Sequence, residues 1–222
     1  MELFINPHFV IIHKQAGFLS VPSRQGAMDS RPCCGKLLEE NLNERIFPVH
    51  RLDECVSGLL LFARTAQAQR VASAWFEHHT VQKHYEALSE ISPETLTKLQ
   101  NPAFTLPLSF EWKSKILRGK KRAYMSPHGK DTHTHATLSS VEQDYCRWDL
   151  YPVTGRSHQL RFELSTHGFP ILGDDLYGAV PHKHWKQKEI ALRLVSLDFK
   201  NCDKAQELGL PLLIETVKLS VK

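Results

Sequence analysis

The spacing of apolar residues in the N-terminal third of the chain predicts strands with helices between them. Apolar runs at 9–13 and 59–63, each bounded by polar or turn-forming residues, predict two strands, the second of them buried. Apolar residues recur at helical spacing within 36–43 and 66–79, and Thr65 is placed to cap the second helix. The segment 23–35, directly before the first of these helices, is rich in turn-forming residues and predicts an exposed loop.

The same pattern predicts more strands than helices in the rest of the chain. Helices are expected at 93–99, which begins with Ser92 and Pro93, and at 157–167, which Gly168 ends. The strands expected are 83–88, 134–141, 146–153, 191–199 and 212–219. The stretch 101–131 is rich in Pro, Lys and Arg, and no element is assigned to it.

The order of these elements predicts an α+β fold built mostly on antiparallel strands. The regular strand–helix alternation of a doubly wound fold is absent, and no glycine-rich phosphate loop follows a strand. No repeat of fixed period appears, which excludes a solenoid. With 222 residues, the chain is expected to form one domain, 1–222, with one continuous core.

The amino-acid composition says more about the cellular compartment of the protein than about its function. The chain has 28 Lys and Arg against 24 Asp and Glu, a net charge of +4 that suits a polyanionic partner without requiring one. Five cysteines without paired spacing argue against a disulfide framework. No signal peptide or membrane-spanning run is apparent, so we expect a soluble, cytoplasmic protein.

The thirteen histidines do not match a metal-binding template. Cys33 and Cys34 are adjacent, and His133 and His135 have no cysteine pair nearby, whereas structural zinc sites space their ligands by two to four residues. This spacing therefore predicts no metal site.

Two segments carry residues suited to chemistry. Asp53 lies in the loop directly before the buried strand 59–63, where a carboxylate can be held rigidly enough to act as a nucleophile. On the predicted helix 157–167, His158 and Arg161 are three residues apart and share a face, so Arg161 could hold a carboxylate ionised. Taken alone, each pattern also fits an ordinary structural role, a turn cap for Asp53 and a solvated basic face for the helix.

A third candidate is Tyr85. Strand alternation within 83–88 puts Lys83, Tyr85 and Ala87 on one face, from which Tyr85 could stack on a base. A core tyrosine would give the same local pattern.

Taken together, these motifs resemble the RluA-type pseudouridine synthase family. HRLDECVSGLLLFA is similar to the family's HRLDxxTSGLLL, KHYEAL to KxYxAL, and GRSHQLRFELSTHGFPILGDDLYG to GRTHQIRVHLxxxGxPIxGDxLYG, in the family's order. The opening VIIHKQAGFLSVP is similar to the family's NKPAG turn, with Gln15 in place of Pro. The resemblance spans residues 4–199 and implies the pseudouridine synthase catalytic fold, a bent, mostly antiparallel sheet flanked by helices around a central cleft.

The resemblance implies a uridine-to-pseudouridine isomerase that flips its target base out of the RNA and uses no cofactor. The family's catalytic Asp, Tyr and Arg match Asp53, Tyr85 and Arg161. Substrate contacts are expected from Arg51, Arg156, His158 and Gln159. The basic residues Arg118, Lys120, Lys121 and Arg122 fit either an RNA contact or a solvated loop.

The implied partner is a structured RNA, a stem-loop of tRNA or rRNA, bound by a monomer without a membrane or an obligate protein partner. No appended S4-like RNA-binding domain is expected. Two other classes stay open at this point: an inactive RNA-binding protein on the same fold, and a metal-dependent hydrolase that uses the histidines.

Overall fold

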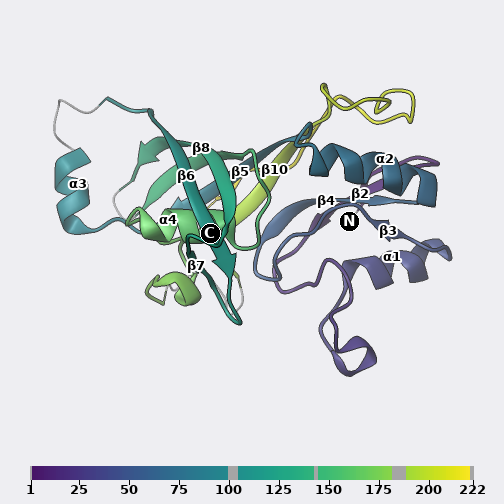
Figure 1. The fold of residues 1–222 in the computed structure, drawn as a ribbon, viewed down its shortest axis with the longest axis horizontal. Coiled ribbons are helices and arrows are strands. Elements are labelled where there is room, and N and C mark those ends of the chain that lie inside the picture. Colours follow the sequence, from purple (N-terminus) through teal and green to yellow (C-terminus); the bar gives the residue numbers. More distant parts are fainter. Residues whose placement is uncertain (1, 100–104, 143–144, 182–188, 221–222) are drawn as a thin grey trace. The chain divides into compact units, whose positions relative to one another are not determined.

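The protein forms two compact units in a computed structural model that describes residues 2–99, 105–142, 145–181 and 189–220 (Figure 1). Unit 1 comprises residues 1–83 and 194–217, and unit 2 comprises residues 84–193 and 218–222. The chain passes between the units inside strands β5 (Gln82–Ser89) and β10 (Leu192–Asp198), and again between Val217 and Lys218. No helix in the described part of the chain is long and apolar enough to cross a membrane.

Unit 1 is a sheet in the order β1-β2-β4-β10. Its strands β1 and β2 pair antiparallel, as do β2 and β4, while the short β3 and β11 pair with β4 and β10. The elements that lie wholly in this unit are β1 (Glu2–Ile5), β2 (Phe9–Lys14), η1 (Gly26–Met28), α1 (Cys34–Leu42), β3 (Phe47–Pro48), β4 (Ser57–Ala63), α2 (Ala66–Glu77) and β11 (Leu213–Glu215).

Helices cover both faces of this sheet, which explains the unbroken apolar run of β4. All seven residues of β4 are buried. Trp75 of α2 packs against Phe9, and Gly35 of α1 faces Phe62 on the other side, so α1 and α2 lie on opposite sides of β2 and β4 (Figure 1). A strand buried on both faces needs no polar alternation.

Unit 2 is an antiparallel sheet in the order β5-β9-β8-β6-β7. Its other elements are α3 (Pro93–Leu99), β6 (Leu108–Arg118), β7 (Ala123–Met125), β8 (Lys130–Val141), β9 (Cys146–Pro152), α4 (Gln159–Thr166) and η2 (Asp175–Tyr177). In β8, Thr132, Thr134, Ala136 and Leu138 are buried while the residues between them are partly or fully exposed. One face of this sheet is therefore core and the other is open to solvent.

Most predicted elements are confirmed, with shifted ends. Thr65 caps α2 by accepting a hydrogen bond from the Ala68 amide, and α3 occupies the predicted residues. The α+β class is confirmed. Helix α4 begins at Gln159 rather than 157, because His158 has a left-handed backbone (φ 58°) that does not continue a helix.

Two expectations about strands were wrong. Residues 101–131, left without elements, contain β6 and β7, and the predicted strand 212–219 is reduced to β11. In β6 the charged side chains face solvent while Trp112 and Ile116 are buried, so the basic composition concealed a two-sided strand. At the C-terminus, the Leu219 amide donates to the buried Glu86 carboxylate (2.7 Å) instead of a neighbouring strand.

Candidate active site

The loop that carries Asp53 is fixed through its main chain. Both main-chain polar groups of buried Leu52 bind one hydroxyl, since Ser20 Oγ accepts from the Leu52 amide (3.0 Å) and donates to its carbonyl (2.9 Å). The Asp53 carbonyl accepts from the Val56 amide (3.1 Å), closing a turn. Asp53 itself is half-buried. The backbone on both sides of the carboxylate is thus held while the side chain keeps access to solvent.

A buried lysine supports this loop from inside unit 1. Lys14, at the end of β2, is fully buried, and its ammonium group donates to the main-chain carbonyls of Val56 (2.7 Å), Glu54 (3.1 Å) and Gln15 (3.0 Å). Burial lowers the pKa of Lys14 to about 8. Two of these three carbonyls belong to the loop that follows Asp53, so Lys14 ties that loop to β2.

His50 and Gly58 fix the two ends of the same loop. His50 Nε2 accepts from the Leu61 amide (3.1 Å), its ring stacks on Phe76, and burial lowers its pKa to about 3, so the imidazole is neutral. Gly58 has a left-handed φ of 121°, and a Cβ there would lie 2.3 Å from the Leu194 carbonyl oxygen. Only glycine fits at this start of β4.

In unit 2, Arg161 is buried and paired with Asp174. Its Nε and Nη2 atoms each donate to one carboxylate oxygen of Asp174 at 2.7 Å, a bidentate arrangement. The two side chains are only 7% and 1% exposed. The guanidinium also lies over the Tyr177 ring, 5.0 Å from its centre. The alternative of a solvated basic face is therefore wrong for this arginine.

His158 and Tyr177 join Arg161 to the basic hairpin. His158 Nδ1 lies 3.0 Å from Tyr177 Oη and 3.4 Å from Arg161 Nη1. The same Tyr177 hydroxyl accepts from the Ala123 amide (2.7 Å) at the start of β7. Four exposed cations stand directly before Ala123, namely Arg118, Lys120, Lys121 and Arg122. The hairpin between β6 and β7 is thus anchored to the cluster that contains Arg161.

A second buried network holds the start of α4 on the sheet. Gln159 Oε1 accepts from the Thr154 hydroxyl (2.8 Å) and the Arg156 amide (3.0 Å), while its Nε2 donates to Thr134 Oγ1 (2.9 Å). Thr134 in turn donates to Glu163 (2.6 Å), whose pKa burial raises to about 7. Gln159 therefore supports the helix from within the protein, and its predicted contact with RNA stays a prediction.

The remaining predicted contacts lie at the surface. Arg156 is half-buried and its Nε donates to the Asp131 carbonyl (3.2 Å), while Arg51 in unit 1 is exposed. Their predicted contacts with RNA stay predictions.

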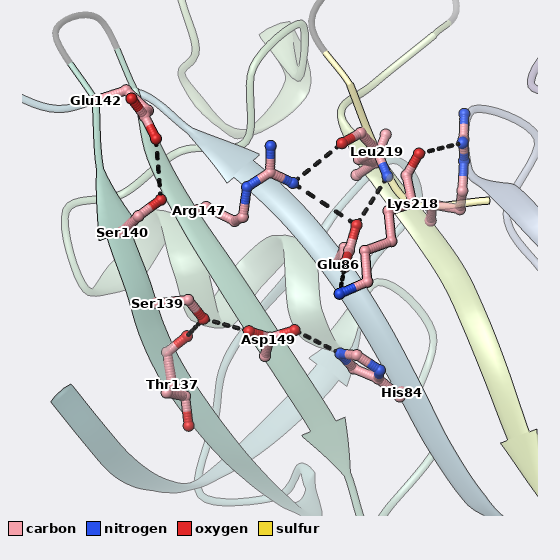
Figure 2. A network of polar contacts seen from close by, with 11 residues as sticks. His84, Glu86, Thr137, Ser139, Ser140, Glu142, Arg147, Asp149, Lys218 and Leu219 are labelled. Carbon is pink, nitrogen blue, oxygen red and sulfur yellow. Dashed lines mark hydrogen bonds and ion pairs between the residues drawn. The ribbon is translucent and has the colours of Figure 1, made fainter. Parts of the chain in front are cut away.

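Tyr85 lies on a strand whose other face is tied down by polar contacts. It pairs with Leu150 of β9 and is half-buried. Because successive strand residues point to opposite faces, its neighbours His84 and Glu86 project from the other face. Figure 2 shows the polar contacts of these two side chains. His84 Nε2 lies 2.6 Å from Asp149, which also accepts from Ser139, and the pKa of Asp149 is lowered by the His84 contact. These contacts fix the strand in which Tyr85 lies.

Glu86 adds a connection to the chain's C-terminal residues. This buried carboxylate accepts from the Leu219 amide, and Arg147 donates to the Leu219 carbonyl (3.0 Å) while lying 3.7 Å from Glu86 (Figure 2). Leu219 is thereby joined to the sheet of unit 2, on the face opposite Tyr85.

The chain matches the family model described as RNA pseudouridylate synthase over residues 8–166. Its relatives include proteins named Dual-specificity RNA pseudouridine synthase RluA. The one from Pasteurella multocida (strain Pm70) is 32% identical over 195 residues, which are 87% of this chain and 84% of the relative. This chain belongs to the RNA pseudouridine synthase family. The relative from Haemophilus influenzae (strain ATCC 51907 / DSM 11121 / KW20 / Rd) is 29% identical over 99% of this chain and 91% of its own.

The fold agrees with this family. The solved structure named Human RNA Pseudouridylate Synthase Domain Containing 1 superposes with a TM-score of 0.68 at 19% identity, covering 99% of this chain and 82% of that one. The chain is therefore an RluA-type RNA pseudouridine synthase, an isomerase that converts uridine in RNA to pseudouridine.

Within this synthase, the structure confirms the neighbourhood of His158 and Arg161 but not every grouping expected from sequence. Asp53 and Arg51 lie in unit 1, and Tyr85, Arg156, His158, Gln159 and Arg161 lie in unit 2. A meeting of Asp53 with Arg161 and Tyr85 stays a prediction. Sequence reasoning missed Lys14 and Asp174, although both stand inside motifs that resemble the family, the opening turn and GDDLYG.

Proposed function

We propose that Asp53 is the nucleophile of this synthase. Its ionised carboxylate attacks C1′ of the target nucleotide as the N1–C1′ bond breaks, and the uracil leaves as an anion. The uracil then rotates, C5 attacks C1′ and displaces Asp53, and loss of the C5 proton with protonation of N1 completes pseudouridine. An electron-poor anomeric carbon presents the same problem that carboxylates solve in glycosidases.

One observation carries this proposal: the main chain on both sides of Asp53 is fixed while its side chain stays accessible. Ser20 holds Leu52, the Val56 amide binds the Asp53 carbonyl, and Lys14 holds the carbonyls that follow. A nucleophile needs this fixed geometry, because a reacting group positioned in advance loses little entropy on the way to the transition state.

Arg161 and Tyr85 are the proposed partners of Asp53. Asp174 fixes the plane of the Arg161 guanidinium, which would hold the Asp53 carboxylate ionised and oriented. Tyr85 would stack on the flipped uracil, and its hydroxyl would take part in removal of the C5 proton in the last step. No step in this sequence calls for a metal or a redox cofactor.

The proposed substrate is a uridine in a stem-loop of tRNA or rRNA, flipped out of its stack for the reaction. Exposed Arg51 would fill the space the base leaves, and the four cations of the β6–β7 hairpin would contact phosphates. The relatives' names describe dual specificity, which makes both RNA classes candidates. We further propose that the protein is cytoplasmic, in keeping with its five free cysteines. We also propose that it acts as a monomer.

Replacement of Asp53 tests the mechanism. Asp53→Ala should abolish pseudouridine formation on an RNA that the wild type modifies, while the urea unfolding midpoint stays within experimental error. Asp203→Ala, an exposed aspartate in the same unit, is the matched control and should retain activity. Appreciable turnover by Asp53→Ala would refute the nucleophile assignment.

Replacement of Tyr85 separates stacking from proton transfer. Tyr85→Phe keeps the ring and should slow product formation in single-turnover experiments, with little change in RNA affinity. An unchanged single-turnover rate would exclude a role for the hydroxyl.

Mapping of pseudouridines in total RNA from cells with and without the gene identifies the target uridine, and a target outside tRNA and rRNA would contradict the proposed substrate.

A further inference from the structure

Two histidines and a glutamate gather on the solvent-facing side of the unit 2 sheet. His133 and His135 are two residues apart in β8 and project from its partly exposed face. Glu111 of β6 stands directly opposite His135 in the strand register. One potential ligand atom from each of the three side chains lies within 4.8 Å of the others. Glu111 is 22 residues or more from the histidines in sequence, so only the pairing of β6 with β8 brings them together.

The donor set suits a divalent transition metal. Two imidazoles and one carboxylate are ligands that zinc accepts, with three protein ligands leaving a position for water. Bonds of about 2.1 Å at tetrahedral angles place ligand atoms roughly 3.4 Å apart. His133 Nε2 and Glu111 Oε1 are already 2.8 Å apart. The pairing of β8 with β6 and β9 fixes the backbone and so keeps the three side chains near one another. Rotation of these side chains can then bring their ligand atoms to the spacing that a metal ion requires.

Of the three proposed ligands, His133 is the one whose position favours metal binding most. Its Nε2 atom is shielded from solvent and has no well-directed hydrogen bond within the described residues, despite its short distance to Glu111. The His133 and His135 rings lie 4.6 Å apart at an interplanar angle of 61°, so they stand side by side. A metal ion would satisfy the shielded nitrogen.

Lys113 is the competitor for this position. It stands opposite His133 in the register, and its ammonium lies 2.7 Å from Glu111 Oε1. The Lys113 and Glu111 side chains are 63% and 50% exposed, so water and salt weaken their attraction. A divalent ion on the same carboxylate can displace the lysine.

We propose that Glu111, His133 and His135 form a binding site for a divalent transition metal ion of the zinc class. The site lies on the face of the unit 2 sheet opposite Tyr85, since Tyr85 pairs with Leu150, on the buried side, whereas His135 pairs with Tyr151 on the other. It is separate from the residues proposed for isomerisation and does not depend on that proposal.

Calorimetric titration of the full chain, without a polyhistidine tag, tests the site with Zn²⁺. Loss of an outer-shell partner costs metal sites about 10–100-fold in affinity, so loss of a ligand should cost no less. His133→Ala, His135→Ala and Glu111→Gln should each weaken Zn²⁺ binding by more than about tenfold. His128→Ala, an exposed histidine in the same unit, is the control and should bind like the wild type. Mg²⁺ should not bind, because it prefers oxygen ligands.

Lys113→Gln gives a second, opposite test. Removal of the competing ammonium should tighten Zn²⁺ binding severalfold, and Zn²⁺ should raise the unfolding temperature of the wild type but not of the ligand variants. The proposal fails if the three ligand variants bind Zn²⁺ like the wild type, or if His128→Ala loses as much affinity as they do. Unchanged Zn²⁺ affinity in Glu111→Gln would remove Glu111 from the ligand set and overturn the site as proposed.

Discussion

The Asp53 loop of unit 1 and helix α4 of unit 2 are held in place by different kinds of polar contact. The loop is held through main-chain groups, by one hydroxyl and one ammonium, Ser20 and Lys14. Helix α4 is held through buried side chains, with Arg161 on Asp174 and Glu163 on Thr134. Changes at Asp174 and Glu163, which hold α4 in place, should therefore change global stability strongly, whereas changes around the loop should act more strongly on turnover than on stability.

The largest stability effect is expected from the Arg161–Asp174 pair. Asp174→Ala leaves a buried guanidinium without its carboxylate, which costs about 3–5 kcal/mol of unfolding free energy. Urea unfolding measures this loss, and Asp175→Ala, the exposed neighbouring aspartate, is the control. Equal stability of the two variants would show that α4 does not depend on this pair.

Glu163 should make stability depend on pH in the opposite sense from a typical carboxylate. Its pKa rises from 4.5 to about 7 on folding, so the folded state holds the proton more tightly and stability falls as pH rises between these values. Glu163→Gln removes this term, and the variant should gain about 3 kcal/mol relative to wild type between pH 4.5 and 7. Denaturant unfolding at several pH values measures it, with exposed Glu94→Gln as control. Parallel curves for wild type and Glu163→Gln would rule out the raised pKa.

Lys14 should affect the loop more than the fold. Lys14→Met leaves buried carbonyls without a donor, which costs about 1–3 kcal/mol near pH 7. Because folding lowers the pKa of Lys14 from 10.5 to about 8, the wild type gains stability over the variant as pH rises through this window.

The same substitution should reduce kcat more than about tenfold by loosening the support of Asp53. Single-turnover and steady-state assays measure the change, and exposed Lys36→Met is the control. If kcat of Lys14→Met matches the wild type, Lys14 stabilises unit 1 without positioning Asp53.

The smallest stability effect is expected at the hairpin tip. Lys120→Ala with Lys121→Ala removes two exposed charges and should change stability by less than about 0.5 kcal/mol. If both lysines contact phosphates, the dependence of RNA affinity on salt should lose about two units of slope. Filter binding over a salt series measures it. An unchanged slope would place the hairpin outside the RNA contact.

The sequence by itself determined the family, the α+β class and most of the elements. Apolar spacing identified α2 and its Thr65 cap, because periodicity and capping are local properties. The motif that contains Asp53 could be recognised since its residues are contiguous. Strand β6 was missed because its segment was judged by its content of charged residues rather than by the alternation of buried and exposed positions along it.

Only the tertiary structure decided which residues support the site. Asp174 is 13 residues from Arg161, and Lys14 is 42 residues from the Val56 carbonyl that it binds. The metal-binding cluster likewise depends on the register between β6 and β8. A buried charge acquires its partner, and its shifted pKa, from packing between distant segments, and no local pattern encodes that distance.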